Sequence, residues 1–187
     1  MLMTGSNRDV NARSQNRLPL RRLLLGALLG LVACSTMSPS PAPGTVTFVV
    51  VRHAEKATDD PRDPSLSEAG QASARRLVDA LAGTPPTAIY ATQYRRTQLT
   101  AQPTAQAYRL PVDEYQAQLA AETLARQLRQ THTSGVVLVV GHSNTVPQIA
   151  TALSGVPVPP MDESVYGVMY RITMGPAQDA VLERTTY

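Results

Sequence analysis

The clearest pattern in the chain is a set of three short apolar runs separated by longer segments of mixed polarity. Residues 45–51 (TVTFVVV) and 136–140 (VVLVV) are mostly β-branched and nearly free of polar side chains, and residues 87–91 (TAIYA) form a shorter run. Continuous apolar runs of this length are typical of strands covered on both faces of a sheet. We therefore expect these three runs to be strands.

The segments between these runs carry apolar residues at helical spacing. The first helix is expected to begin after a capping serine, Ser65 or Ser67, and to stop at Gly83. Three more helices are expected at residues 94–108, with Pro103 as a candidate interruption, 117–130, and 146–153, with Pro147 in the first turn.

The tail of the chain, residues 164–184, is expected to hold one or two late strands. Strands that alternate with helices predict an α/β fold. The expected architecture is a three-layer sandwich, with helices on both faces of a mostly parallel central sheet. In such sheets, ligands bind beyond the carboxyl ends of the strands.

The first 33 residues have the pattern of an export signal. Five arginines precede an apolar run from Leu23 to Ala33, about half the length needed to span a bilayer. Small residues end the run, as at a cleavage site. We expect residues 1–33 to be a signal peptide, and the Arg21-Arg22 pair leaves both Sec and Tat export open.

The only cysteine, Cys34, directly follows this run. The Leu31-Val32-Ala33-Cys34 sequence resembles the bacterial lipobox, in which the cysteine after the cleavage site is acylated. That resemblance implies a lipid anchor, and Ser35 implies sorting to the outer membrane, on its periplasmic face. A cysteine without modification is the alternative.

The leader also accounts for the basic character of the chain. Residues 34–44 form a Ser/Pro-rich tether, and residues 45–187 are enough for one domain. Of 17 basic and 14 acidic side chains in the chain, five and one lie in the leader, which leaves 12 and 13. The remainder thus has a net charge of −1, which gives no support for nucleic-acid binding.

Histidines and arginines follow the predicted strands at the points where these strands end. Arg52 and His53 come after the first run, His142 follows Gly141 after the VVLVV run, and the pair Arg95-Arg96 follows the TAIYA run. Parallel strands end at a common edge, so these side chains are expected to converge. Guanidinium groups bind phosphate through paired hydrogen bonds, and an unprotonated imidazole nitrogen is a nucleophile. The cluster therefore predicts phosphoryl transfer.

The same residues carry a family resemblance. Residues 52–56 (RHAEK) resemble the Arg-His-Gly/Ala-Glu signature of the histidine phosphatase superfamily, the phosphoglycerate mutase-like fold. Residues 63–70, 89–101 and 141–147 resemble, in order, its first helix start, its "SSPLxRTxQTA" segment and the second-histidine motif of its short bacterial members. The resemblance covers the chain from residue 45 to about residue 170.

The resemblance implies a role for each matching residue. His53 is implied to be the phosphorylated nucleophile, with Arg52, Arg96 and His142 in the phosphate pocket. Two further residues, Glu55 and Ser143, are taken as substrate-binding. No metal ion and no organic cofactor are implied, and the substrate is expected to be a phosphorylated small molecule or a phosphopeptide. Neither the physiological substrate nor the oligomeric state can be derived from the sequence.

Two departures from the family pattern affect the proton donor for the leaving group. Ala91-Thr92-Gln93 replaces the usual Ser-Ser-Pro, which leaves Arg96 in register. Ser143 after His142 replaces the aspartate of the acid-phosphatase branch, which disfavours that branch. Glu114 lies where the mutase-like branch places its acid, and Glu55 is the competing candidate.

The interpretation favoured by these patterns is a phosphatase that works through a phosphohistidine on His53. A non-enzymatic lipoprotein that binds a phosphorylated ligand and a phosphomutase remain as alternatives. A zinc site is also suggested by His53-Ala54-Glu55, but the deaminase pattern needs a CxxC pair that a chain with one cysteine does not have. His132 is expected to be a loop residue.

Overall fold

The structure is a computed structural model that describes residues 44–177 and 179–187. The predicted signal peptide, Cys34 and all of the tether except residue 44 lie outside the described residues, and they remain predictions. In the described ranges, no helix combines the length and the apolar character that crossing a bilayer requires.

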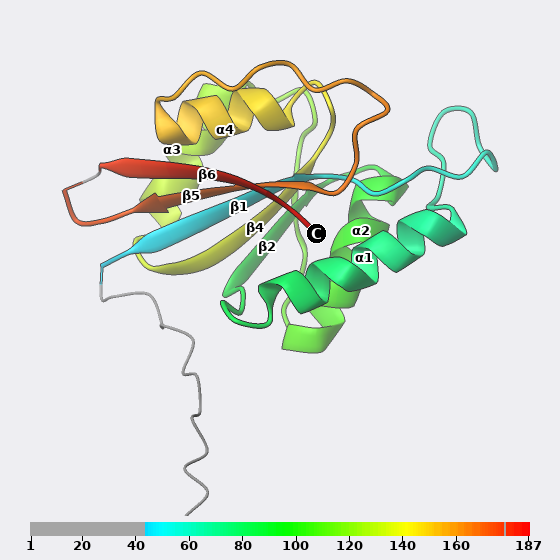
Figure 1. Cartoon of the computed structure of the whole chain (residues 1–187), viewed down its shortest axis with the longest axis horizontal. Helices are drawn as coiled ribbons and strands as arrows, with labels where there is room; N and C mark the ends of the chain where they lie inside the picture. Colours follow the sequence, from blue (N-terminus) through cyan, green and yellow to red (C-terminus); the bar gives the residue numbers. More distant parts are fainter. Residues whose placement is uncertain (1–43, 178) are drawn as a thin grey trace, which may run out of the picture. The chain divides into compact units, whose positions relative to one another are not determined.

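Within these ranges, six strands form one sheet in the order β3-β2-β4-β1-β5-β6 (Figure 1). Their bounds are β1 Val46–Arg52, β2 Ala88–Thr92, β3 Asp113–Tyr115, β4 Gly135–Gly141, β5 Val168–Met174 and β6 Ala180–Thr186. The first four pair in parallel, whereas β5 runs antiparallel to both β1 and β6. The predicted α/β fold is confirmed, and the two late strands make its sheet a mixed one.

Helices cover both faces of the sheet, as Figure 1 shows. One face carries α1 and α2, and the other carries α3 and α4. Their bounds are α1 Glu68–Leu81, α2 Arg95–Tyr108, α3 Ala121–Thr131 and α4 Val146–Ser154. The expected three layers are therefore present.

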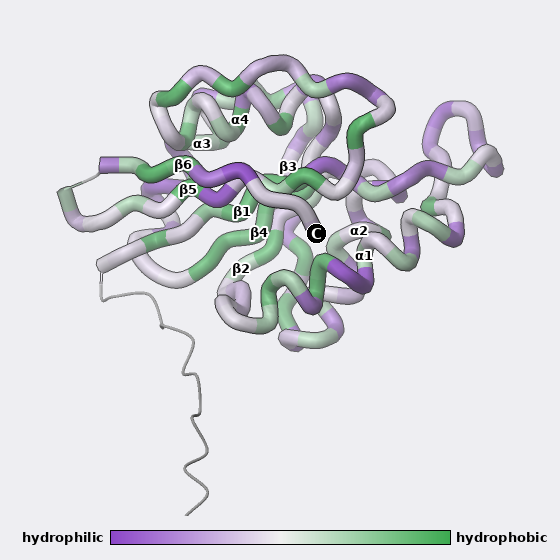
Figure 2. The backbone as a smooth tube through the Cα atoms, in the orientation of Figure 1, coloured by the Kyte–Doolittle hydropathy of each residue, from purple (hydrophilic) through white to green (hydrophobic). Residues whose placement is uncertain are grey.

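The two central strands supply both halves of the hydrophobic core. Along β1, Phe48 and Val50 pack with the α3 and α4 side, whereas Val49 and Val51 pack with the α1 and α2 side. Successive side chains of a strand point to opposite faces, so a strand covered on both sides is apolar at most positions. Figure 2 shows that most of β4 and the middle of β1 are hydrophobic.

Local contacts explain where α1 and α3 begin. Ser67 caps α1 by accepting a hydrogen bond from the Gly70 N–H, which decides between the two candidate serines. α2 continues through Pro103, so the candidate interruption is absent. α3 begins at Ala121 rather than at residue 117, because the preceding residues form a turn closed by the bond from Leu119 N–H to the Gln116 carbonyl.

The strand β3 was not predicted from the sequence. It has three residues, two of them exposed and acidic, so it has neither the length nor the apolar pattern of the other parallel strands. Its one buried side chain is Tyr115, whose hydroxyl donates to the Val140 carbonyl at 3.1 Å. That contact ties β3 to the end of β4, close to His142.

Candidate active site

The neighbouring strands β1 and β4 end at the same edge of the sheet, and the connections that follow them lead to strands on opposite sides of this pair. The chain leaves β1 through α1 toward β2 on one side, and leaves β4 through α4 toward β5 on the other. Arg52 pairs in register with Gly141, and the His53 N–H donates to the Gly141 carbonyl at 2.9 Å. Such an arrangement leaves a crevice beyond the strand ends, where α/β sheets bind their ligands.

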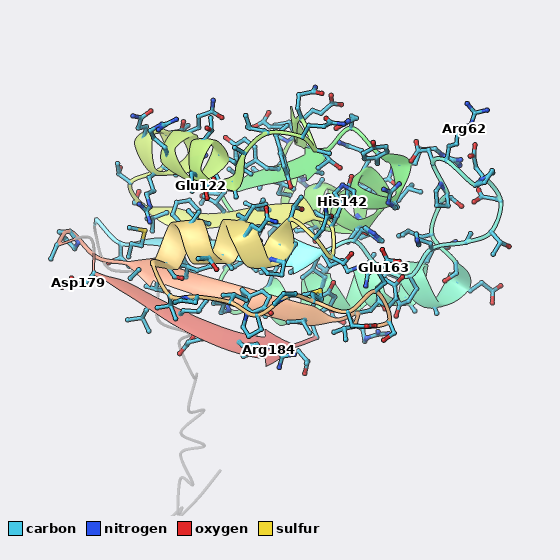
Figure 3. All side chains as sticks on the ribbon, turned by 90° about the horizontal axis from the view of Figure 1, so that it is seen from above. Arg62, Glu122, His142, Glu163, Asp179 and Arg184 are labelled. Atoms are coloured by element: carbon cyan, nitrogen blue, oxygen red, sulfur yellow. The ribbon has the colours of Figure 1, made fainter. Side chains whose placement is uncertain are left out.

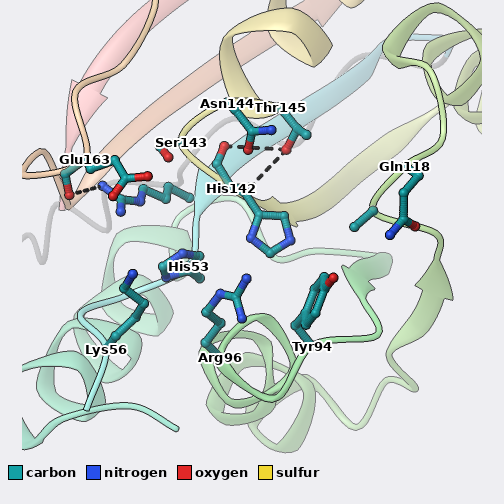
Figure 4. Close-up of a pocket in the computed structure, with 12 residues that line it drawn as sticks. His53, Lys56, Tyr94, Arg96, Gln118, His142, Ser143, Asn144, Thr145 and Glu163 are labelled. Atoms are coloured by element: carbon teal, nitrogen blue, oxygen red, sulfur yellow. Dashed lines mark hydrogen bonds between the residues drawn. The ribbon is translucent and has the colours of Figure 1, made fainter. Parts of the chain in front are cut away.

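The predicted histidines and arginines do come together in this crevice. The imidazole centroids of His53 and His142 are 5.5 Å apart. A cavity of about 310 Å³ lies between them and the start of α2 (Figure 4). Its lining residues are Arg52, His53, Lys56, Tyr94, Arg96, Ala117, Gln118, His142, Ser143, Asn144, Thr145 and Glu163.

His53 is held as a neutral ring in which one nitrogen has no hydrogen-bond partner among the described residues. Its Nδ1 lies 2.8 Å from the Ala54 carbonyl oxygen, which can only accept, so Nδ1 carries the proton and Nε2 carries the lone pair. Burial lowers the pKa of His53 to about 3; the carbonyl bond opposes this effect, and the charge of Arg52 adds to it. The Ala54 N–H is fixed in turn by Thr100 Oγ1 at 2.9 Å. A buried, oriented and unprotonated imidazole nitrogen is suited to nucleophilic attack.

The second histidine sits in the tight turn between β4 and α4. The His142 N–H donates to Thr145 Oγ1 at 3.0 Å, and the His142 carbonyl accepts from Val146 N–H at 2.9 Å. Burial first, and then Arg96 and Arg52, lower the pKa of His142 to about 4. Its Nε2 lies 3.0 Å from Thr92 Oγ1 at the end of β2.

Arg96 reaches the cavity from the first turn of α2. Its guanidinium carbon lies 4.4 Å from the ring centroid of Tyr94, and its Nη1 lies 3.5 Å from an oxygen of Asp63. Asp63 also accepts from the Arg95 N–H at 3.0 Å, and it thereby fixes the 57–64 loop to the start of this helix. Arg95 itself is mostly exposed and pairs with Asp59. Of the two adjacent arginines, Arg96 is therefore the one that lines the cavity.

Arg52 also makes main-chain contacts that were not predicted from the sequence. Its Nη1 donates to the main-chain carbonyls of Glu163 at 2.7 Å and Val165 at 2.8 Å. Its guanidinium carbon lies 4.0 Å from the ring centroid of Tyr166. The Nε atom is buried and has no hydrogen-bond partner among the described residues. Arg52 therefore anchors the loop before β5 while it lines the cavity.

Neither predicted proton donor lines the cavity. Glu114 is an exposed residue of the edge strand β3, and its neighbour Tyr115 takes the buried orientation. Its role as an acid stays a prediction. Glu55 is half-buried, and it too lies outside the lining, with its Oε2 unpartnered among the described residues. The one carboxylate of the lining is Glu163, and Figure 3 shows it at the same end of the sheet as His142, opposite Asp179. Ser143 does line the cavity.

Several lining residues were missed for physical reasons. Lys56 belongs to the quoted RHAEK motif and Tyr94 to the segment after β2, so strand-end reasoning could have included both. Glu163 could not have been found in this way. It lies in a connection without an apolar pattern, and only the contacts of Arg52 bring that connection to the cavity.

The cavity thus combines five basic side chains with one carboxylate. Such a site attracts a dianionic ligand and offers guanidinium donors to its oxygens. Three or more histidine, cysteine or acidic side chains gathered as for a metal ion do not occur among residues 44–177 and 179–187.

Comparisons with known proteins give one family match and several similar folds. Residues 48–119 match the model of the histidine phosphatase superfamily (branch 1). A structure of the protein histidine phosphatase SixA complexed with tungstate is 17% identical, with a TM-score of 0.61 over 75% of this chain and 96% of that chain. A mycobacterial glucosyl-3-phosphoglycerate phosphatase is 16% identical, with a TM-score of 0.58 over 76% and 98% of the two chains. No curated protein sequence is significantly similar to the chain.

A third similar structure comes from a eukaryote. A phosphoserine phosphatase from Entamoeba histolytica, in complex with 3-phosphoglyceric acid, is 13% identical, with a TM-score of 0.59 over 76% of this chain and 98% of that chain. The matches span nearly the whole length of each of these proteins. The family model gives a sequence match over residues 48–119, and the solved structures are similar to the described domain in fold.

Proposed function

We propose that the chain is a phosphatase that hydrolyses a phosphomonoester or a phosphoprotein through a phosphohistidine on His53. The observation that carries the proposal is the free Nε2 of His53, which is held in place by the bond from Nδ1 to the Ala54 carbonyl inside a cavity lined by basic groups. The family match and the phosphatase names of the similar structures support the same reaction class.

The reaction has two steps. In the first, the lone pair on His53 Nε2 attacks phosphorus, the bond from phosphorus to the leaving oxygen breaks, and that oxygen takes a proton. In the second, water attacks the phosphohistidine, inorganic phosphate leaves, and His53 returns to its neutral form. Arg52, Arg96 and His142 would stabilise the charge on the phosphoryl oxygens in both steps. Glu163 is the carboxylate of the lining that could supply the first proton.

The test uses the purified full chain with a panel of small phosphomonoesters and phosphopeptides. Wild type should release inorganic phosphate and show an acid-labile mass increase of one phosphoryl group. His53→Ala should lose at least about a thousandfold in kcat/KM, because the nucleophile is absent. His132→Ala, which changes a histidine outside the cavity, should retain activity. A folded wild-type protein without turnover on any substrate would refute the proposal, and phosphate binding by a wild-type protein that turns over no substrate would indicate a binding protein instead.

We also propose that the protein is exported and anchored to the cell envelope through acylated Cys34, with residues 35–44 as a tether. The basic, apolar and lipobox-like order of the leader supports this proposal. In a bacterial host, labelled fatty acid should enter wild type, and Cys34→Ala should abolish this label and leave the protein outside the membrane fraction. Labelling that persists in Cys34→Ala would contradict the anchor.

A further inference from the structure

Two buried threonines stand behind His142. Thr92 is the last residue of β2, Thr97 lies in the first turn of α2, and both side chains are fully buried. Thr92 Oγ1 lies 3.0 Å from His142 Nε2 and 2.8 Å from Thr97 Oγ1. The two hydroxyls therefore form a chain that ends on the imidazole.

The direction of this chain follows from counting protons. Thr97 Oγ1 also lies 2.7 Å from the Tyr94 carbonyl oxygen and 2.9 Å from the Thr92 carbonyl oxygen. Carbonyl oxygens only accept, and a hydroxyl brings one proton. If Thr97 donated to Thr92 Oγ1, both carbonyl contacts would be close oxygen pairs without a proton. If Thr97 shares its proton between the carbonyls, Thr92 donates to Thr97, and every contact in the chain contains a proton.

This direction determines the tautomer of His142. Because the Thr92 proton points to Thr97, Thr92 Oγ1 accepts from His142, and the ring proton is on Nε2. Nδ1 is then the ring nitrogen left for a ligand, and it makes no hydrogen bond to any described residue. His53 has the opposite tautomer, with its proton on Nδ1. The two neighbouring rings are thus set in complementary states by different acceptors.

We propose that Thr92 is a positioning residue that holds His142 as the Nε2–H tautomer, so that Nδ1 binds a proton, and through it a phosphoryl oxygen, when substrate occupies the cavity. This inference rests on the proposed phosphatase function. A substrate monoanion brings the proton on its own phosphoryl oxygen, and a dianion binds together with one proton from solvent. The proton is returned to solvent when inorganic phosphate leaves.

The charges around His142 explain why the proton binds only together with the ligand. Arg52 and Lys56 face the cavity from the end of β1, Arg96 from α2, and Glu163 from the loop before β5; the neutral rings of His53 and Tyr94 lie beside His142. Burial and the two guanidiniums lower the pKa of His142 to about 4, so the empty site holds a neutral ring at pH 7. A dianionic phosphoryl group would offset these positive charges and favour the imidazolium.

The tautomers can be observed directly, since the chain has three histidines. We would label histidine with nitrogen-15 in the full-length protein, assign each ring by single substitution, and read the ring-nitrogen chemical shifts at pH 7. The expected result is Nε2–H for His142 and Nδ1–H for His53, with a second proton on His142 when inorganic phosphate saturates the site. An Nδ1–H tautomer of His142, or a neutral ring in the phosphate complex, would overturn the proposal.

Substitutions of Thr92 distinguish a positioning role of its hydroxyl from a packing role of its side chain. Thr92→Val keeps the shape and removes the hydroxyl, so kcat should fall about tenfold to hundredfold, as expected when a buried hydrogen bond to a charged ring is lost, and the Nε2–H signal of His142 should weaken. Thr92→Ser should restore kcat to within about threefold of wild type. Thr104→Val is the matched control, because Thr104 is a fully buried threonine of α2 whose hydroxyl has no partner among the described residues.

The outcomes distinguish the two proposals. An inactive wild type refutes the phosphatase, while the tautomer of His142 is still read from the spectra. An active wild type with an unchanged kcat in Thr92→Val refutes the positioning role alone. If Thr92→Val does not fold, the ring-nitrogen spectra of the wild type still decide.

Discussion

A histidine and an arginine lie near each end of strand β4, but their surroundings differ. At its carboxyl end, His142 and Arg96 line the cavity of about 310 Å³. At its amino end, a cavity of about 160 Å³ is lined in part by His132 and Arg129. There, Arg129 donates to the carbonyls of Ala152 and Leu153 at the end of α4, and His132 Nε2 lies 2.9 Å from the Tyr90 hydroxyl.

The difference lies in which groups remain open to a ligand. At the amino end, Arg129 binds main-chain carbonyls of a helix end, whereas Arg96 at the carboxyl end donates to no main-chain carbonyl among the described residues. Each histidine has one side-chain partner, Tyr90 for His132 and Thr92 for His142. At the carboxyl end, the helices α2 and α4 begin rather than end, so their positive N-termini add to the basic side chains. The direction of the parallel strands therefore concentrates anion-binding capacity at one edge.

The largest expected effect that tests this comparison comes from the two arginines. Arg96→Ala should lower kcat/KM at least about a hundredfold with little change in stability, because a donor to the phosphoryl oxygens is lost. Arg129→Ala should leave kcat/KM within about twofold and lower the free energy of unfolding by about 1–2 kcal/mol, because two carbonyl bonds are lost. Kinetics and urea unfolding of both variants measure these two effects. A loss of activity in Arg129→Ala would contradict the difference between the two ends of β4.

The fold could be predicted from the sequence further than the site. The runs that became β1 and β4 are buried on both faces, so their composition alone identifies them. β3 could not be identified, because its stability comes from pairing with β2 and from the buried Tyr115 rather than from its own pattern.

For the site, strand-end reasoning found the basic groups that follow directly on a strand. It could not find the partners that lie beside them only in three dimensions. Asp63, Thr92 and Glu163 belong to this group, since each acts through a contact with a residue far away in the sequence. Glu114 does not line the cavity, because its sequence position does not decide which way a side chain of β3 points, and its role as proton donor stays a prediction.

The next prediction concerns acid stability. The pKa values of His53 and His142 are lowered to about 3 and about 4 from an ordinary value of 6.5. The unfolded chain therefore binds protons below pH 6.5 that the folded chain does not, and stability falls as the pH drops from 6.5 toward 4. Each ring should contribute a slope of up to about 1.4 kcal/mol per pH unit in that interval.

Urea unfolding at pH 7, 6 and 5 measures this slope. His142→Gln should flatten it, because the ring whose protonation differs between the two states is gone. His132→Gln at the opposite edge should leave most of it in place. Equal slopes for wild type and His142→Gln would contradict the contrast between the two ends.

The smallest expected effect concerns Asp63, the acidic side chain beside Arg96 at the carboxyl edge of the sheet. Asp63→Asn keeps an oxygen for the Arg95 N–H but removes the charge that lies 3.5 Å from Arg96. Since a partly exposed ion pair is weak, KM for a dianionic substrate should fall by about twofold to fivefold, and the difference should shrink in high salt. A rise in KM without loss of fold would show that Asp63 orients Arg96 rather than competing for it.

The anchoring of the loop before β5 has an evolutionary consequence. Arg52 holds that loop through main-chain carbonyls, and every amino acid supplies the same carbonyl oxygen. The side chains of Asp162 and Ser164 can therefore be exchanged while the wall of the cavity keeps its attachment, whereas Glu163 is the candidate proton donor and Val165 packs against the core. This segment is a suitable place to vary the sequence when a new substrate preference is selected in the laboratory, because side chains can be changed there without altering the histidines and arginines of the cavity.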